Sequence, residues 1–331
     1  MTERLRALRE RLATPVDATG LATFRILFGL LVAFGALRFL WNGWIDELYV
    51  APRYHFHYLG FDWVRVWPGW GMHAHFVGLA GLGLLVALGA FYRPAIVLLF
   101  LAFTYVELLD VTAYLNHYYL VSLLALLLCF LPAAATWSVD AARRPGVQSD
   151  TVPLAAPVAL RLQLGIVYFF AGLAKLGEDW LVHAQPLNIW LSSRTELPLV
   201  GPLLGDPRVA LAMGWAGFLY DTTIPLWLSL PRTRLVAFVV LLGFHGATGL
   251  LFPIGLFPLI MTTGALVFFP QDLPRRLLAR FTGRGPSRPV VGTSRGPLPA
   301  LAFAALATHV GLQVLIPLRH HLYGGDVLWH E

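Results

Sequence analysis

The chain has 331 residues, of which 57% are hydrophobic and only 13% are charged. This balance is too apolar for ordinary soluble domains and indicates an all-α polytopic membrane protein. The formal charge of +6 does not predict nucleic-acid binding, because the basic residues are spread over separate loops. The single cysteine, Cys129, excludes an internal disulfide and a cysteine-based metal site, and we expect it to be a small buried apolar residue.

The N-terminal segment, residues 1–16, is basic and amphipathic and reads MTERLRALRERLATPV. No short apolar region in it ends at a small-residue cleavage site, so we expect no cleaved signal peptide. The first apolar run would then remain as an uncleaved anchor. Residues 17–331 are predicted to form one transmembrane domain.

Apolar runs recur along that domain. A spanning helix needs about 20 mostly apolar residues, because it rises about 1.5 Å per residue across a hydrocarbon layer of roughly 30 Å. Nine runs fit, although the third, seventh and eighth are short or polar at one end, and residues 234–269 can instead form a re-entrant pair. The nine runs cover residues 21–40, 74–92, 94–109, 116–134, 157–176, 209–230, 234–250, 253–269 and 297–317.

The basic residues predict the orientation of these helices. Alternate loops on one side hold 15 of the 24 Lys and Arg residues, and the loops on the other side hold 5. By the positive-inside rule the N-terminus is cytoplasmic and, with nine spans, the C-terminus is extracytoplasmic. The outer segments 41–73, 177–208 and 318–331 are rich in Trp, Tyr, His and Pro, and we expect them to form ordered caps.

Polar residues inside or beside the predicted spans are functional candidates, because each costs several kcal/mol in lipid unless it is paired or hydrated. In the predicted topology they gather at outer helix ends, and one outer-leaflet pocket can collect them. Lys175, the only lysine of the chain, ends the fifth run. The other residues at outer ends are His73, His75, Glu107, Asp110, Asn116, His117 and His245.

Each of these residues also has a structural explanation. Lys175 can extend its ammonium to the headgroups, and interfacial histidines can be part of an aromatic belt. His245, in GFHGATG, is as consistent with a structural hydrogen bond as with a ligand contact. Asp221 lies deeper in its span, so we expect a buried partner, Arg or His. For Arg25 and Arg161, near inner ends, snorkelling or helix-to-helix pairing is sufficient.

The histidine spacings do not predict a metal site. His55 and His57, and likewise His73 and His75, are two residues apart, but no carboxylate or third histidine stands at a set distance from either pair. A lone lysine at the membrane can do other chemistry. Burial lowers the pKa of an amine and so produces a neutral base near pH 7. A lipophilic weak acid such as a quinol would meet such a base without leaving the bilayer.

Several blocks of sequence, in one order from about residue 17 onward, resemble the vitamin K-dependent gamma-glutamyl carboxylase family. The family shares its membrane module with bacterial proteins that carry a horizontally transferred transmembrane (HTTM) domain. Colinear blocks are more specific than any single motif. The matching blocks are DATGLATFRILFGLL, DVTAYLNHYYLVSLLALLLCFLPAAATWSVD, RLQLGIVYFFAGLAKLGEDW, GWAGFLYDTTIPLWL, and FHGATGLLFPIGLFP with FFPQDLPRRL.

The resemblance implies a membrane enzyme that oxygenates vitamin K hydroquinone, or menaquinol, to its epoxide with O2. The strong base formed in that step removes a glutamate gamma-proton before CO2 adds. In the family a lysine at the position of Lys175 deprotonates the hydroquinone. Asn116 and His117 match an Asn-His pair near the quinone, and His245 and His320 match further site histidines. The resemblance gives Asp110 and Asp221 supporting roles.

Two features depart from the family pattern. The family's aspartate two residues after the lysine is replaced by Gly177, so its helper role passes to Glu178 or Asp179 or is absent. The sequence also ends at VLWHE, where animal carboxylases continue into a large extracytoplasmic domain that holds the protein substrate. We therefore expect a membrane core that retains the base and the quinone pocket, and that captures a glutamate-containing protein or peptide less efficiently.

Two other functions stay open. One is a quinol epoxidase or oxidase without carboxylation, and the other is a quinone-binding or lipid-binding module without enzymatic activity. A transporter fits less well, because we find no inverted repeat and no matched pair of interrupted spans. The predominance of arginine over lysine indicates a GC-rich bacterial source, and hence the inner membrane with the active site facing outside.

Overall fold

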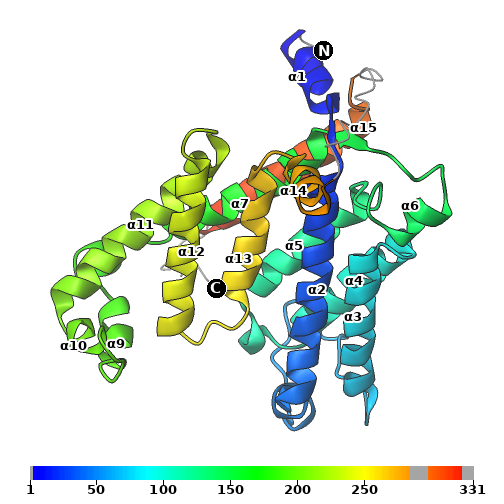
Figure 1. Cartoon of the computed structure of the whole chain (residues 1–331). Helices are drawn as coiled ribbons and strands as arrows, with labels where there is room; N and C mark the ends of the chain where they lie inside the picture. The colour runs from blue at the N-terminus through cyan, green and yellow to red at the C-terminus, as the bar shows by residue number, and fades with distance from the viewer. Residues whose placement is uncertain (1–2, 284–296, 323–331) are drawn as a thin grey trace. The chain divides into compact units, whose positions relative to one another are not determined.

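The computed structural model describes residues 3–283 and 297–322. The described chain is mostly helical and divides into two compact units (Figure 1). Unit 1 comprises residues 1–160 and 259–298, and unit 2 comprises residues 161–258 and 299–331. Two helices, α7 (Ala155–Leu173) and α13 (Phe257–Ala265), run through the boundaries between them.

Unit 1 contains the long helices α2 (Thr19–Trp41), α3 (Gly71–Leu88) and α4 (Tyr92–Leu109) and the only strand pair among the described residues. β1 (Pro15–Asp17) pairs antiparallel with β2 (Thr151–Pro153). The other α-helices of this unit are α1 (Glu3–Ala13), α5 (Asn116–Phe130), α6 (Val139–Arg143) and α14 (Leu273–Thr282). A π-helical turn, Asp46–Val50, and 3-10 turns at Val111–Ala113 and Leu266–Phe268 complete it.

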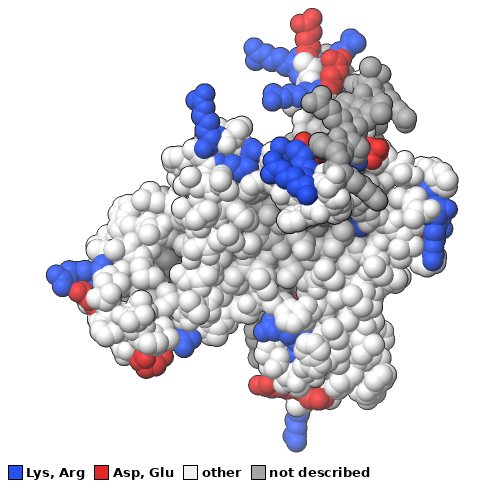
Figure 2. Space-filling model, viewed as in Figure 1, with Lys and Arg blue, Asp and Glu red and all other residues white. Residues whose placement is uncertain are grey.

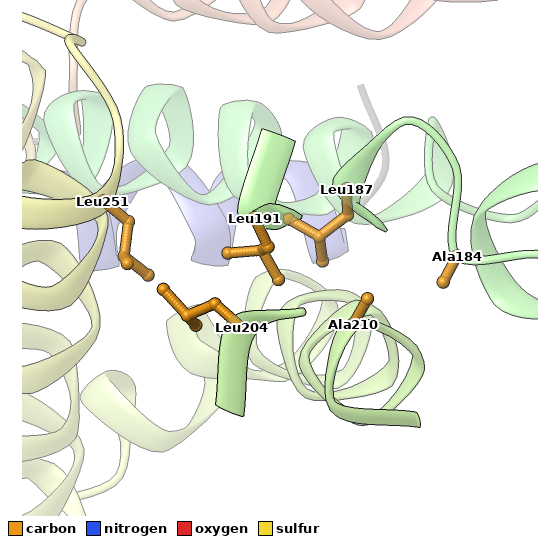
Figure 3. Packing of buried hydrophobic residues seen from close by; sticks show 6 residues of the cluster. All are labelled: Ala184, Leu187, Leu191, Leu204, Ala210 and Leu251. Atoms are coloured by element: carbon orange, nitrogen blue, oxygen red, sulfur yellow. The ribbon is translucent and has the colours of Figure 1, made fainter. Parts of the chain in front are cut away.

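Unit 2 is built around two long helices, α11 (Pro207–Ser229) and α12 (Arg234–Leu251). Three short helices precede them: α8 (Glu178–Leu181), α9 (Leu187–Ser192) and α10 (Gly201–Leu204). α15 (Ala300–Leu315) and a 3-10 turn at Pro317–Leu322 end the described chain. α9 and α10 pack on α11 through a small apolar core, shown in Figure 3. Its members are Ala184, Leu187, Leu191, Leu204, Ala210 and Leu251.

Small residues allow α2 and α3 to lie side by side in unit 1 (Figure 1). A Cβ atom added at Gly29 would lie 2.5 Å from the carbonyl oxygen of Gly83 and 2.5 Å from the amide nitrogen of Ala87. Only glycine permits this approach of two backbones, which is a common way for helices to pack in lipid. Any side chain larger than the hydrogen atom of Gly29 would force the two helices apart.

Arg25 of α2 is fully buried, with 0% of its surface exposed, and it does not extend to a membrane surface. Its guanidinium donates hydrogen bonds to four backbone carbonyls. Nη1 contacts Ala133 O at 3.0 Å and Thr136 O at 3.4 Å. Nη2 contacts Ala87 O at 3.3 Å and Trp137 O at 2.5 Å. The arginine thus joins α2, the end of α3 and the turn after α5, which is the helix-to-helix role that the sequence left open.

Replacing Arg25 with lysine is expected to destabilise unit 1 by about 2 kcal/mol. An ammonium keeps the charge but lacks the planar fork that reaches carbonyls on separate segments, and each lost charged hydrogen bond costs about 1.5–3 kcal/mol. The unfolding midpoint of the purified protein in detergent measures this loss. Arg4→Lys, at an exposed position on α1, is the control. Equal midpoints for Arg25→Lys and the control would contradict the role of the carbonyl contacts.

Every one of the nine predicted runs overlaps a helix of the structure. Five helices, α2, α3, α4, α7 and α12, are long and apolar enough to cross a membrane by length and composition. Three shorter apolar helices cover residues 116–130, 257–268 and 300–315. α11 has 23 residues but is more polar and is not among the five. The number of spans, the re-entrant alternative and the orientation of the termini stay predictions.

Charge is distributed along the helices of unit 1 as a bilayer would require. In the view of Figure 2, Lys, Arg, Asp and Glu gather near helix ends, and the flanks of α2, α3 and α4 between those ends are nearly free of charge. Many large apolar side chains are exposed on these flanks, including Leu84, Leu98 and Leu101. An apolar helix surface of this extent is stable in lipid rather than in water. The protein is accordingly an integral membrane protein.

Candidate functional site

Lys175 lies in the turn that follows α7, and its side chain folds back into unit 2. Nζ donates to Asp221 Oδ2 on α11 at 2.7 Å and to the carbonyl oxygen of Ala171 at 2.9 Å. Only 21% of the lysine side chain and 9% of the aspartate side chain are exposed. The expectation of an arginine or histidine partner for Asp221 is wrong. Its partner is the lysine, because α7 and α11 are neighbours at this level.

Glycines create the space for this ion pair. A Cβ at Gly172 of α7 would lie 2.5 Å from Thr222 Cγ2 and 2.9 Å from the Thr222 backbone nitrogen, so the two helices are in direct contact there. A Cβ at Gly217, one turn before Asp221, would lie 4.0 Å from Lys175 Cε. A larger residue at Gly217 would therefore reduce the room around the lysine stem.

Trp180 of α8 covers the ion pair. The ammonium of Lys175 lies 5.3 Å from the centre of the Trp180 ring, within the range of a cation–π contact. The indole Nε1 donates to Gly214 O on α11 at 3.1 Å, which fixes the ring in place. Lys175 therefore has a carboxylate on one side and an aromatic face on another, and both favour a localised positive charge.

His245 of α12 lies at the centre of an aromatic cluster, with 1% of its surface exposed. Its Nε2 is 2.9 Å from the Tyr168 hydroxyl on α7 and 3.3 Å from the Tyr220 hydroxyl on α11. The rings of Phe244 and Phe257 meet the imidazole edge to face, each with centroids 5.4 Å apart. The second nitrogen, Nδ1, is buried and has no hydrogen-bond partner in the part of the chain that the structure describes.

Helix geometry links the histidine cluster to the ion pair. Tyr168 lies in α7, and Lys175 follows seven residues later in the turn at the end of this helix. Tyr220 and Asp221 are neighbours on α11. We call this set the polar seam of unit 2: Tyr168, Lys175, Tyr220, Asp221 and His245. Sequence reasoning missed the two tyrosines, although the seven-residue spacing from Lys175 was a usable signal for Tyr168.

The remaining predicted residues belong to other elements of the chain. Asn116 and His117 begin α5 in unit 1, and His117 is buried. Their convergence with Lys175 and His245 in one pocket stays a prediction. His320 falls in the turn Pro317–Leu322, and its side chain lies outside the described part of the chain.

Glu178 and Asp179 form no ion pair with Lys175 among the described residues, and their helper role stays a prediction. Both are exposed, and Glu178 Oε1 is 3.5 Å from His183 Nε2 rather than near the lysine. The carboxylate in contact with Lys175 is that of Asp221 on another helix. Within residues 3–283 and 297–322, no group of three or more His, Cys, Asp or Glu side chains could hold a metal ion.

Asp110, between α4 and α5, fixes the loop that contains His55 in unit 1. Its Oδ1 accepts from the Thr112 amide at 2.9 Å and from the Thr112 hydroxyl at 2.7 Å. Its Oδ2 is 3.2 Å from His55 Nδ1, and His55 Nε2 is 3.1 Å from Tyr49 O. Burial raises the pKa of the Asp110 carboxyl, but the hydrogen bonds from Thr112 and His55 outweigh burial, and the net pKa lies below its usual value.

Replacing Asp110 with asparagine is expected to lower the thermal midpoint at pH 6, with an effect that vanishes in acid. A carboxyl with a lowered folded pKa stabilises the protein above its unfolded pKa, near 4, and loses that contribution as the pH falls through the folded pKa. The experiment measures the difference in thermal midpoint between wild type and Asp110→Asn at several pH values from 6 to 3. Asp62→Asn, at an exposed position of the loop that contains His55, is the control. A difference in midpoint that is as large at pH 3 as at pH 6 would contradict stabilisation by the ionised Asp110 carboxylate.

A family model described as the HTTM domain matches residues 13–273. The chain belongs to the HTTM family. HTTM is the domain of the vitamin K-dependent carboxylase family, so the resemblance found in the sequence is confirmed. The matched region contains the whole polar seam and leaves α15 outside. No solved structure matches the chain.

Proposed function

We propose that this HTTM protein oxygenates a membrane-dissolved hydroquinone, with Lys175 as the base that removes a hydroxyl proton. The observation that carries the proposal is the contact of Lys175 Nζ with Asp221 Oδ2 at 2.7 Å beneath Trp180. A lysine at the edge of the membrane-spanning region that pairs with a carboxylate on another helix is a functional candidate by its location alone. Membership of a family of carboxylases supplies the reaction class.

The residues of the polar seam fit an aromatic diol. Sites for such ligands combine apolar and aromatic walls with a few placed polar atoms. Tyr168, Phe244 and Phe257 provide aromatic surface around His245. The Nδ1 atom of His245 is buried without a partner among the described residues, so a ligand oxygen there would satisfy it. Lys175 and Asp221 provide the proton-accepting group.

Lys175 and Asp221 act together in this proposal. A proton shared across 2.7 Å lies on the amine in the charged pair and on the carboxylate in the neutral pair. In the neutral pair the amine of Lys175 is free to accept a hydroxyl proton at Nζ. The ammonium so formed donates to the carbonyl oxygen of the protonated Asp221, the hydroquinone anion balances its charge, and Trp180 limits the access of water to it. A bound hydroquinone would supply the reducing equivalents by which O2 gives the epoxide and one water.

Carboxylation is the second half of the proposed activity. The base generated by oxygenation would remove a gamma-proton from a glutamate of a protein or peptide, and CO2 would add to the resulting carbanion. Asn116, His117 and His320 are proposed to orient the quinone oxygens. We propose the bacterial inner membrane as the location, with the site opening outward.

The experiment that tests this function uses the purified chain in nanodiscs with reduced menaquinone or vitamin K, air, a glutamate-rich peptide and labelled bicarbonate. Epoxide together with label in the peptide would support the full reaction. Epoxide without label would support a quinol epoxidase instead. A folded protein that forms neither product would contradict both.

A quinone-binding role without chemistry is the second candidate, and one observation favours it. The ammonium of Lys175 already has two acceptors, Asp221 and Ala171, as a purely structural pair would. Under that account the folded protein binds menaquinone and forms no epoxide, and Lys175→Met leaves the affinity unchanged.

A further inference from the structure

We infer that Tyr168, with Tyr220, holds His245 in the tautomer that carries its proton on Nδ1, so that Nδ1–H donates to a ring oxygen of the substrate. The inference deepens the proposed function, and it rests on that function for the identity of the ligand. It assigns a positioning role to two tyrosines that the sequence did not single out.

The hydrogen bonds at Nε2 carry the first step. A neutral imidazole has one donor nitrogen and one acceptor nitrogen, and the partner of one nitrogen decides the state of the other. Two phenolic hydroxyls face Nε2, at 2.9 Å from Tyr168 and 3.3 Å from Tyr220. A phenol is a stronger acid than a neutral imidazole N–H, and an imidazole lone pair is a better acceptor than a phenolic oxygen. The favoured arrangement therefore has Tyr168 donating to Nε2.

The hydrogen bond at Nε2 also decides the protonation of Nδ1, the other ring nitrogen of His245. When Nε2 accepts, Nδ1 must carry the proton. Nδ1 is buried and meets no acceptor among the described residues. A buried N–H without an acceptor destabilises the protein until an acceptor reaches it. His245 is thus prepared for a ligand that brings an acceptor oxygen.

The surroundings restrict that ligand further. The rings of Phe244 and Phe257 pack edge to face on the imidazole, and the Tyr220 ring stacks on Phe244 with centroids 3.8 Å apart. The ligand oxygen at Nδ1 must therefore belong to a molecule that is otherwise apolar. A quinone or hydroquinone ring oxygen meets this condition, whereas a water-soluble anion does not.

Histidine nitrogen-15 spectra of the full chain in nanodiscs test the tautomer without any substrate. The chain has 11 histidines, and His245→Gln identifies the resonance by its loss. We expect wild-type His245 to show a protonated Nδ1 and an unprotonated Nε2. In the double variant Tyr168→Phe/Tyr220→Phe nothing donates to Nε2, so the Nε2–H form should appear. If the double variant does not fold, the single variant Tyr168→Phe should show the same change in part.

Tyr92→Phe is the matched control. It also removes a buried hydroxyl, which donates to Leu128 O at 2.8 Å, but it lies in unit 1. It should leave the His245 spectrum unchanged. A protonated Nε2 in the wild type, or a double variant that keeps the wild-type spectrum, would overturn the inference.

Ligand binding tests the second part. Menaquinone with a short tail should bind about tenfold more weakly to Tyr168→Phe than to wild type. A methylnaphthalene that lacks the ring oxygens should bind both proteins equally. Equal loss for both ligands would overturn the role of Nδ1–H as a donor to oxygen. If the spectra and the quinone affinities are as expected but the protein forms no epoxide, the role of the tyrosines is supported and the proposed catalysis is contradicted.

Discussion

Lys175→Met is expected to lower epoxide formation about 100- to 10,000-fold, which is the usual contribution of a positioned general base. Methionine keeps an unbranched side chain of similar length, so packing between α7 and α11 is largely retained. What is lost is the group that accepts the hydroxyl proton. Initial rates of epoxide formation from reduced menaquinone, at saturating quinol, measure the effect on kcat.

Arg208→Met is the matched control for that experiment. Arg208 lies in the same unit, is exposed, and pairs only with Asp206 at the start of α11, so its loss removes one positive charge without touching the seam. The control should retain the wild-type rate. An unchanged rate in a folded Lys175→Met protein would show that the lysine is not the base.

Asp221→Leu is expected to destabilise the folded protein by about 3 kcal/mol. The substitution leaves the ammonium of Lys175 partly buried without its carboxylate, and breaking such a pair from one side costs about 3–5 kcal/mol. The lower end of this energy range applies because 21% of the lysine side chain is exposed to solvent. Unfolding by denaturant in mixed micelles measures the change.

The double variant Lys175→Met/Asp221→Leu separates charge from packing. Replacing both partners with apolar residues removes the uncompensated charge, and such replacements are often neutral in energy. We expect the double variant to be more stable than Asp221→Leu alone and to remain inactive. A double variant whose loss of stability equals the sum of the losses in Lys175→Met and Asp221→Leu would mean that the two residues are not energetically coupled.

The positions of the helices could be predicted from the sequence because each depends on a local property. A run of apolar residues bounded by polar turns is sufficient to locate α2, α3, α4 and α12, and it also located α11 in spite of Asp221. The short strands β1 and β2 were not predicted. Their three-residue pairing depends on segments more than 130 residues apart, so no local pattern indicates it.

The partners of the buried polar residues could not be predicted from the sequence. The sequence singled out Lys175, Asp221 and His245, but it paired Asp221 with the wrong kind of residue. Which side chains meet depends on how α7, α11 and α12 pack, and that packing follows from close contacts such as the one between Gly172 and Thr222. Arg25 illustrates the same limit, because its carbonyl partners come from segments that periodicity does not connect.

The most direct test of lysine-dependent quinol oxygenation is a single-turnover reaction of the protein with reduced menaquinone under oxygen-18 gas, followed by mass spectrometry of the product. The account predicts an epoxide that carries one oxygen-18 atom from wild type, and none above the protein-free background from a folded Lys175→Met variant. Plain menaquinone as the only product of the folded wild type, or labelled epoxide in equal amount from the variant, would contradict it.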